Sequence, residues 1–150
     1  MPTVIVMRGL PGSGKSTWIR EHADSAFVCS ADSFFVGFDG AYRFDPTRLP
    51  EAHAACLRDF TRELLARAEP VIVVDNTNTT LIEMAPYVAL AQAYGAEVRI
   101  VECQAAPDVC AARNIHGVPG AAIERMATRM ASERCPPWWP TVEFAPGGGV

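Results

Sequence analysis

Residues 9–16 of this chain read Gly9-Leu10-Pro11-Gly12-Ser13-Gly14-Lys15-Ser16, which matches the pattern G-x-x-x-x-G-K-[ST]. An apolar run typical of a buried strand, Thr3–Met7, precedes the motif, and a helical stretch from Lys15 to about Ala23 follows it. In that context the glycines let backbone amides turn inward at phosphate oxygens, and the helix N-terminus adds its positive dipole end. The stretch therefore predicts a phosphate-binding loop rather than a glycine turn with a chance lysine.

Individual side chains of this loop have predicted roles. Lys15 is the only lysine among 13 basic residues, and its compact charge is expected to bridge the β- and γ-phosphates of a nucleotide. The Ser16 hydroxyl is expected to ligate Mg²⁺. The predicted ATP-binding residues of the loop are Gly12, Ser13, Gly14, Lys15, Ser16 and Thr17.

The rest of the chain alternates short apolar runs with helical stretches, a pattern typical of parallel βαβ construction. We expect an α/β P-loop NTPase fold with three layers, α/β/α, around a mostly parallel sheet of four or five strands, and a helical lid. After the first strand and helix, further strands are predicted at 26–29, 71–74, 97–102 and 141–144, and helices at 45–68, 81–94, 107–113 and 121–133. Ser30–Phe44 lacks a period and is expected to be a loop with one helical turn at most.

Composition excludes several classes of protein. The 150 residues carry a net charge of -4, so any contact with nucleic acid has to come from a local patch. The apolar N-terminal run ends before Arg8, too short for a signal peptide or a membrane span. The odd cysteine count without a C-x-x-C pair suggests neither a disulfide framework nor a zinc site and favours the reducing cytoplasm; the residues are Cys29, Cys56, Cys103, Cys110 and Cys135.

Two acidic residues follow predicted strands. Asp32 comes three residues after the second strand, and Asp75 closes the third. Because carboxyl ends of parallel strands share one edge of the sheet, both acids are expected beside the phosphate-binding loop. Phosphoryl transfer needs a carboxylate that accepts the acceptor's proton and a second acid near Mg²⁺. One of the two acids can serve as the base and the other as metal support, with simple capping of a turn and of the following helix as the alternative.

Three arginines flank the glycine-containing turn Asn114–Gly120 and resemble those of a lid that closes over a nucleotide. Arg113 is the predicted catalytic cation, and Arg125 and Arg129 are predicted to bind ATP. A solvated arginine face on an amphipathic helix is the alternative for Arg125 and Arg129. His116 is left without a role.

Taken together, four segments resemble the polynucleotide-kinase-like family of P-loop kinases: Gly9–Trp18, Ser30–Asp32, Asp75–Asn78 and Arg113–Pro119. The resemblance extends from Val4 to about Arg134. It implies that Asp32 activates the substrate hydroxyl, that the Asp-Asn-Thr-Asn element lies beside the active site, and that Arg113 belongs to a lid over ATP. We therefore take Asp32 as the base and Asp75 as a metal residue, and the reverse assignment of the two acids stays open.

The chain departs from this family at Phe35, where the polynucleotide kinase has an arginine that holds the nucleic-acid phosphate. Arg43, on the same loop, is expected to supply a phosphate contact instead. Phe34, Phe35 and Tyr42 are expected to stack on a base, with ordinary packing beneath the loop as the alternative. Trp138 and Trp139, flanked by prolines, are expected to cover the core or the adenine side.

The motifs therefore predict a Mg²⁺-requiring kinase that moves the γ-phosphate of ATP to a hydroxyl of DNA or RNA, as a polynucleotide 5′-hydroxyl kinase does. It would comprise one P-loop kinase domain over residues 1–145 and a flexible glycine-rich tail over 146–150. Two other acceptors stay open: a hydroxymethylated base in DNA, and the hydroxyl of a small molecule such as a nucleoside, sugar or antibiotic. An ATPase or a non-catalytic ATP switch is disfavoured, because no water-activating signature is recognisable.

Overall fold

A sheet of five parallel strands forms the centre of the computed structural model, which describes residues 1–114 and 117–145. The strand order is β2-β3-β1-β4-β5. Parallel ladders join all neighbouring strands, so the predicted parallel sheet is confirmed. The strands are β1 (Thr3–Arg8), β2 (Phe27–Cys29), β3 (Val71–Asp75), β4 (Glu97–Cys103) and β5 (Thr141–Phe144).

Strands β1 and β3 lie in the middle of the sheet and are buried on both faces, as their continuous apolar runs predict. Alternate residues of β1 enter two different clusters of the core. Val4 and Val6 face the larger cluster, whereas Ile5 and Met7 face the smaller one on the opposite side.

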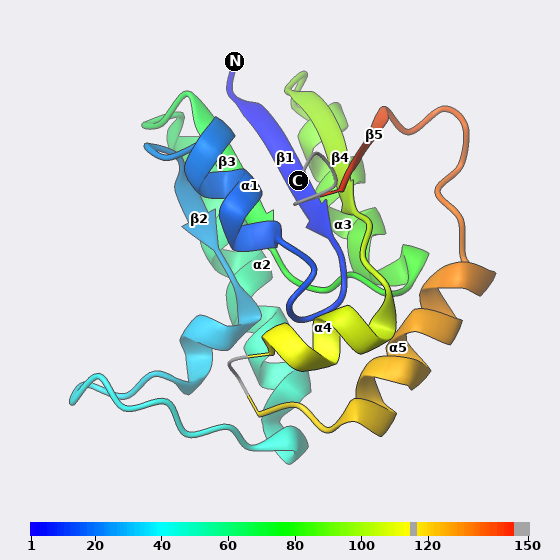
Figure 1. The fold of residues 1–150 in the computed structure, drawn as a ribbon. Helices are drawn as coiled ribbons and strands as arrows, with labels where there is room; N and C mark the ends of the chain where they lie inside the picture. The colour runs from blue at the N-terminus through cyan, green and yellow to red at the C-terminus, as the bar shows by residue number, and fades with distance from the viewer. Residues whose placement is uncertain (115–116, 146–150) are drawn as a thin grey trace.

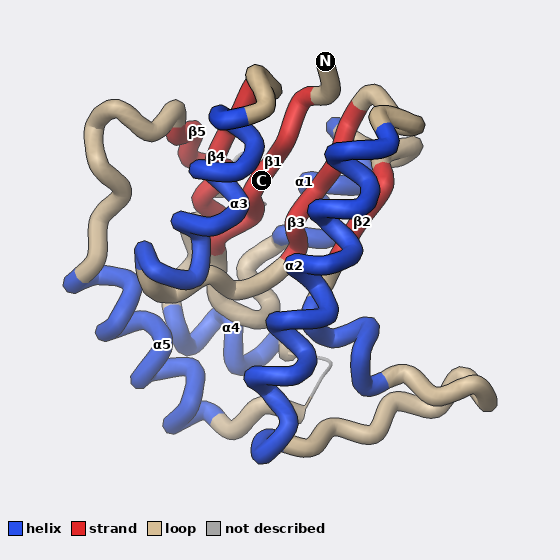
Figure 2. The backbone as a smooth tube through the Cα atoms, turned by 180° about the vertical axis from the view of Figure 1, so that it is seen from behind, coloured by secondary structure: helices blue, strands red, loops and turns tan. Residues whose placement is uncertain are grey.

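Helices cover both faces of the sheet and give the predicted three-layer architecture (Figures 1 and 2). Helix α1 (Lys15–His22) packs on one face, and helices α2 (Leu49–Ala66) and α3 (Leu81–Ala93) pack on the other. Helices α4 (Pro107–Arg113) and α5 (Gly120–Ser132) lie beside each other below the carboxyl edge of the strands. This edge is where the phosphate-binding loop emerges.

The segment expected to be a loop contains more structure than its sequence suggests. Residues Ala31–Phe35 form a 3₁₀ helix, η1, and an antiparallel bridge pairs Val36 with Tyr42. Asp45 caps a short 3₁₀ helix, Pro46–Arg48, that leads into α2, because its Oδ1 accepts a hydrogen bond of 3.0 Å from the Thr47 amide.

The two tryptophans separate. Trp139 is partly buried and packs against the larger core cluster, as one of the two expectations has it. Trp138 is 74% exposed and lies outside the core, so the expectation that it covers the core is wrong for this residue, and its place on the adenine side stays a prediction.

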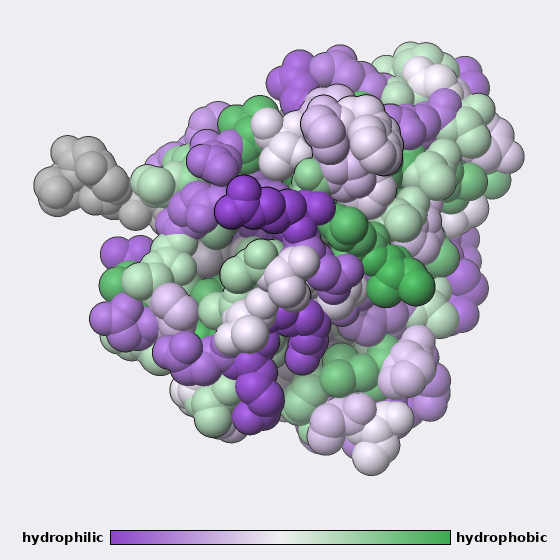
Figure 3. Space-filling view, turned by 90° about the vertical axis from the view of Figure 1, so that its right-hand side faces the viewer, coloured by the Kyte–Doolittle hydropathy of each residue, from purple (hydrophilic) through white to green (hydrophobic). Residues whose placement is uncertain are grey.

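Several further expectations concern the chain as a whole. All five cysteines are free thiols. Among the described residues, no helix combines the length and apolarity needed to cross a membrane. The face at the right of Figure 1 mixes hydrophilic and hydrophobic side chains (Figure 3). His116 and the expected tail 146–150 lie outside the described residues.

Candidate active site

A cavity of about 670 Å³ opens at the carboxyl edge of the sheet, and we call it the edge cavity. It is lined by the phosphate-binding loop, η1, the end of β3, and helices α2, α4 and α5. The structure brings together nine residues that the sequence assigned to the site: Gly12, Gly14, Lys15, Ser16, Thr17, Asp32, Asp75, Arg113 and Arg129.

The phosphate-binding loop has the backbone that its glycines permit. Gly12 and Gly14 have φ angles of 80° and 104°, in the left-handed region that other residues rarely adopt. A Cβ on Gly12 would lie 2.6 Å from the carbonyl oxygen of Cys110, so the loop also packs directly against α4. Ser13 is buried, and its Oγ has no hydrogen-bond partner among the described residues. A compact loop with an orphaned polar atom fits a phosphate group.

Lys15 lies folded over this loop. Its Nζ donates hydrogen bonds of 2.8 Å to the Gly9 carbonyl and 3.0 Å to the Leu10 carbonyl. Burial lowers the pKa of Lys15 from its ordinary value, and the negative charge of Asp75 opposes that shift. The ammonium therefore sits in the edge cavity close to the acid assigned to the metal, as a phosphate clamp requires.

Asp32 is exposed on η1 and accepts a hydrogen bond from another side chain of the edge cavity. The Tyr42 hydroxyl donates to Asp32 Oδ1 at 3.2 Å, while the Asp32 amide donates to Ser30 Oγ at 3.1 Å and fixes the turn. Burial, followed by the charge of Asp32, raises the pKa of Tyr42. The carboxylate of Asp32 thus accepts a hydrogen bond from a hydroxyl group. A general base needs to accept such a hydrogen bond from the hydroxyl that it deprotonates.

The Asp-Asn-Thr-Asn element connects the parts of the site. Asn76 Oδ1 accepts a hydrogen bond of 2.8 Å from the Ala31 amide, next to Asp32. Asn78, in the left-handed region at φ 50°, donates through Nδ2 to the Met7 carbonyl at 2.7 Å. The Gly9 amide donates to the Thr77 carbonyl at 3.0 Å. This element therefore connects the candidate base to the start of the phosphate-binding loop through hydrogen bonds.

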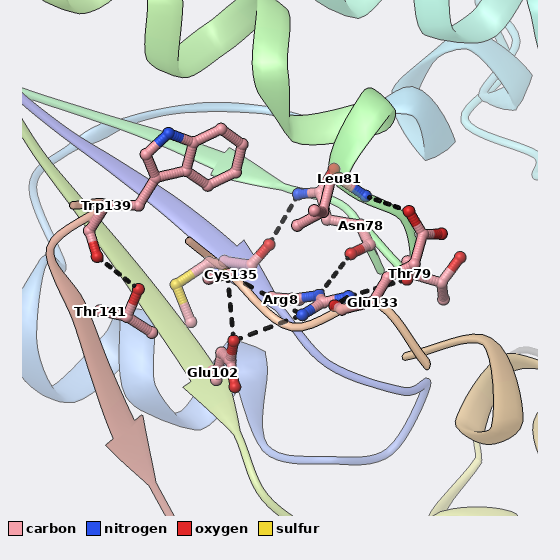
Figure 4. A network of polar contacts seen from close by, with 10 residues as sticks. Arg8, Asn78, Thr79, Leu81, Glu102, Glu133, Cys135, Trp139 and Thr141 are labelled. Carbon is pink, nitrogen blue, oxygen red and sulfur yellow. Dashed lines mark hydrogen bonds and ion pairs between the residues drawn. The ribbon is translucent and has the colours of Figure 1, made fainter. Parts of the chain in front are cut away.

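Arg8 is a residue whose importance the sequence does not reveal. Its side chain is 2% exposed and lies at the end of β1 (Figure 4). The guanidinium donates to the carbonyls of Asn78 (2.8 Å), Thr79 (2.8 Å) and Glu133 (2.7 Å), and pairs with the Glu102 carboxylate at 3.4 Å. Arg8 thus ties the Asp-Asn-Thr-Asn element to the segment that follows α5.

The predicted lid arginines divide into two groups. Arg113, at the end of α4, and Arg129, on α5, both line the edge cavity. Arg129 Nη1 also donates to Thr79 Oγ1 at 3.3 Å. Arg125 is exposed and does not line the cavity, so its predicted contact with ATP is not supported in this arrangement.

Of the four predicted acceptor residues, Phe34, Phe35 and Arg43 do not line the edge cavity and lie at a second groove beside it. The Phe35 ring is 6% exposed within the core and offers no face for a base. Phe34 is packed against the core beneath the Arg48 guanidinium, 4.7 Å from its ring centre. Arg43 forms an ion pair with Asp39. The sequence distance from Asp32 does not show which aromatic side chains of this segment pack into the core and which line the cavity.

The aromatic residues that do line the cavity are Tyr42 and Phe44, and α2 adds Leu49 and His53. Tyr42 was one of the expected stacking residues, whereas Phe44 was not. The sequence signal that could have identified this pair is their spacing of two residues, because side chains two residues apart lie on the same side of an extended segment.

Comparison with known proteins shows which family the chain belongs to. A family model described as "AAA domain" matches residues 4–132. The human NEDD4-binding protein 2 is 38% identical over 130 residues, which are 82% of this chain but only 7% of that protein's length.

Two solved structures are similar in fold. A chain of the Pnkp1/Rnl/Hen1 RNA repair complex has a TM-score of 0.69 at 20% identity, over 87% of this chain and 44% of that one. A sugar kinase from Janibacter sp. HTCC2649 has a TM-score of 0.62 at 17% identity, over 96% and 85% respectively. The chain therefore belongs to this AAA domain family and has the α/β fold of the P-loop kinases.

Proposed function

We propose that this ATP-dependent P-loop kinase transfers the γ-phosphate of ATP to a hydroxyl of a nucleic acid. The observation that carries the proposal is the shared lining of one cavity by Lys15 and Asp32, with Asp32 already accepting a hydrogen bond from a hydroxyl. A cation for the phosphates and a base for an alcohol are the two groups that phosphoryl transfer requires.

ATP would supply an activated γ-phosphoryl group. Lys15 and the loop amides would hold its phosphates, and the Ser16 hydroxyl and Asp75 would hold a Mg²⁺ ion that neutralises their charge. Asp32 would take the proton of the acceptor hydroxyl while the new oxygen–phosphorus bond forms and the bond to the bridging β–γ oxygen breaks, releasing ADP. Arg113 and Arg129 would stabilise the charge that develops on the transferred group.

Two observations favour a nucleic acid as the acceptor. A neighbour in fold belongs to an RNA repair complex. In addition, a groove of about 470 Å³, which we call the outer groove, shares Phe44 with the edge cavity and carries Arg43 and Arg48. A strand whose terminal hydroxyl enters the edge cavity could lay its phosphates along these arginines.

A small alcohol is the second candidate, because the acceptor side of the edge cavity, with Tyr42, Phe44, Leu49 and His53, carries no lysine or arginine. Another neighbour in fold is a sugar kinase. A hydroxymethylated base within DNA would suit the same side chains.

Incubation with γ-labelled ATP and a panel of acceptors tests the proposal. The panel contains 5′-hydroxyl DNA and RNA oligonucleotides, the same oligonucleotides with 5′-phosphates, 5′-phosphorylated DNA with hydroxymethylated bases, nucleosides and simple sugars. We expect label on the 5′-hydroxyl oligonucleotides and none on their phosphorylated controls. Label confined to nucleosides or sugars would reject the nucleic-acid acceptor, and label on phosphorylated DNA that carries hydroxymethylated bases would indicate the base as acceptor.

A further inference from the structure

Residues 36–44 fold back on themselves beside η1. Val36 pairs with Tyr42 in an antiparallel bridge, and the Gly37 amide donates to the Ala41 carbonyl at 2.9 Å. Gly40 makes the turn possible with a φ of 79°. The Arg43 amide then donates to the Phe35 carbonyl at 2.9 Å and anchors the returning arm to η1. This hairpin therefore holds residues 42–44 in a defined position.

Two aromatic rings of the returning arm stand side by side on the edge cavity. The rings of Tyr42 and Phe44 are nearly parallel, at 15°, with centres 6.5 Å apart, and these residues are 41% and 51% exposed. The buried ring of Phe35 meets both edge-on, with centres 6.3 Å from Tyr42 and 5.1 Å from Phe44. Phe35 thus supports from the core a pair of rings that both remain partly exposed.

This aromatic pair is linked directly to the candidate base. The Tyr42 hydroxyl donates to Asp32 Oδ1 at 3.2 Å, so one ring of the pair lies within a hydrogen bond of the atom that would accept a proton. An acceptor whose hydroxyl reaches Asp32 must therefore place the rest of its structure near these rings. If the hydroxyl belongs to a nucleotide, the nucleobase on the same sugar is the group that Tyr42 and Phe44 would bind best, because aromatic side chains stack on any nucleobase.

We propose that Tyr42 and Phe44 form the subsite for the nucleobase of the acceptor's terminal nucleotide, and that the Tyr42 hydroxyl orients Asp32 until the acceptor hydroxyl binds there. This inference rests on the proposed function and adds to it a means of selection. The pair would favour the hydroxyl of a nucleotide over that of an aliphatic alcohol. This selection would not require the phosphate-binding arginine that the related kinase has at the position of Phe35.

The direct test compares two 5′-hydroxyl oligonucleotides that are identical except that one has an abasic residue at its 5′ end. Stacking of one base predicts a KM for the normal oligonucleotide that is lower by about 5-fold to 150-fold. Tyr42→Ala and Phe44→Leu should each reduce this preference by raising the KM of the normal oligonucleotide alone. Phe38→Ala is the matched control, since Phe38 is fully exposed on the same hairpin and does not line the cavity.

Tyr42→Phe separates the hydroxyl from the ring. The variant should keep the preference for a terminal base, because the ring remains. Loss of the hydrogen bond that orients Asp32 should lower kcat while the KM of the normal oligonucleotide stays unchanged, a split that loss of ring packing would not produce. An unchanged kcat would overturn the role of the hydroxyl.

The outcomes separate this inference from the proposed function. Equal KM values for the normal and abasic oligonucleotides would overturn the nucleobase subsite while the kinase activity on nucleic acid stands. Retention of the full preference in both Tyr42→Ala and Phe44→Leu would also overturn it, by placing the base elsewhere. If neither oligonucleotide is labelled while a sugar is, the proposed function and the subsite both fail.

Discussion

Lys15 is the charged side chain of the phosphate-binding loop. Its Nζ lies within 3.0 Å of the Leu10 carbonyl and 2.8 Å of the Gly9 carbonyl, positions that suit a compact ammonium and not a planar guanidinium. Lys15→Ala and Lys15→Arg should therefore both lower transfer from γ-labelled ATP by about 1000-fold or more. Thermal unfolding of both variants should resemble that of the native protein. A Lys15→Arg enzyme with native turnover would contradict the point-charge role.

Arg8 is the residue on which we expect the stability of the site to depend most. Its replacement by methionine would leave the Glu102 carboxylate and three carbonyls without their shared donor in a nearly water-free region. Loss of one member of a buried ion pair costs about 3–5 kcal/mol, so urea denaturation of Arg8→Met should show a fall of that size in the free energy of unfolding. A loss below about 1 kcal/mol would mean that the network is not tightly coupled.

Sequence reasoning at this scale succeeds where a motif restricts the chemistry and fails where only packing decides. The positions of the phosphate-binding loop, Asp32 and Asp75 at the edge cavity were predictable because each lies at or after the carboxyl end of a strand. Arg8 is the last residue of β1 but looks like a surface cation in the sequence, since nothing in its neighbours reveals the carbonyls of Thr79 and Glu133 that meet it in the fold. Phe35 was misassigned for the same reason, because burial depends on contacts distant in sequence.

Among the elements, α4 and α5 carry the cations of the proposed lid. Arg113 and Arg129 line the edge cavity and Arg125 does not, although Arg125 and Arg129 lie one turn apart on α5. Arg113→Ala should lower kcat by about 100-fold, the usual effect of removing one stabilising donor. Arg129→Ala should lower kcat less, because this arginine also donates to Thr79. Arg125→Ala is the internal control and should have native kinetics; a loss as large as that of Arg113→Ala would reverse the assignment.

Prediction of elements from the sequence followed the strength of their periodicity. The β-branched run of β3 and the apolar stripe of α2 were recognisable, and their observed bounds differ from the predicted ones by four residues at most. The hairpin over 36–44 was not predicted, because it is held by the Val36–Tyr42 bridge and by packing on Phe35 rather than by local propensity.

For the whole molecule, the layered architecture was predictable but the strand order was not. Alternation of strands and helices implies a parallel sheet, whereas the position of β1 between β3 and β4 depends on pairing between distant segments. The location of the site followed without that order, because all carboxyl ends of a parallel sheet lie on the same edge.

The net charge of -4 bears on how a nucleic acid would bind. Contacts limited to the outer groove should make the KM for an oligonucleotide rise with salt by a log–log slope of about 0.7 for each phosphate held. Arg43→Ala and Arg48→Ala should each flatten the slope, while the KM for ATP changes less. A KM independent of salt would contradict phosphate recognition and favour a small acceptor.

The central claim is that the edge cavity transfers the γ-phosphate of ATP to a nucleic-acid hydroxyl with Asp32 as the base. The most direct test measures single-turnover transfer from γ-labelled ATP to a 5′-hydroxyl oligonucleotide, with the native protein and with Asp32→Asn. Calorimetry gives the ATP affinity of both proteins. The account predicts label at the 5′ end with the native protein, and in Asp32→Asn an unchanged ATP affinity with transfer slowed by at least about 100-fold. Native transfer by Asp32→Asn, or no label on the oligonucleotide with the native protein, would contradict it.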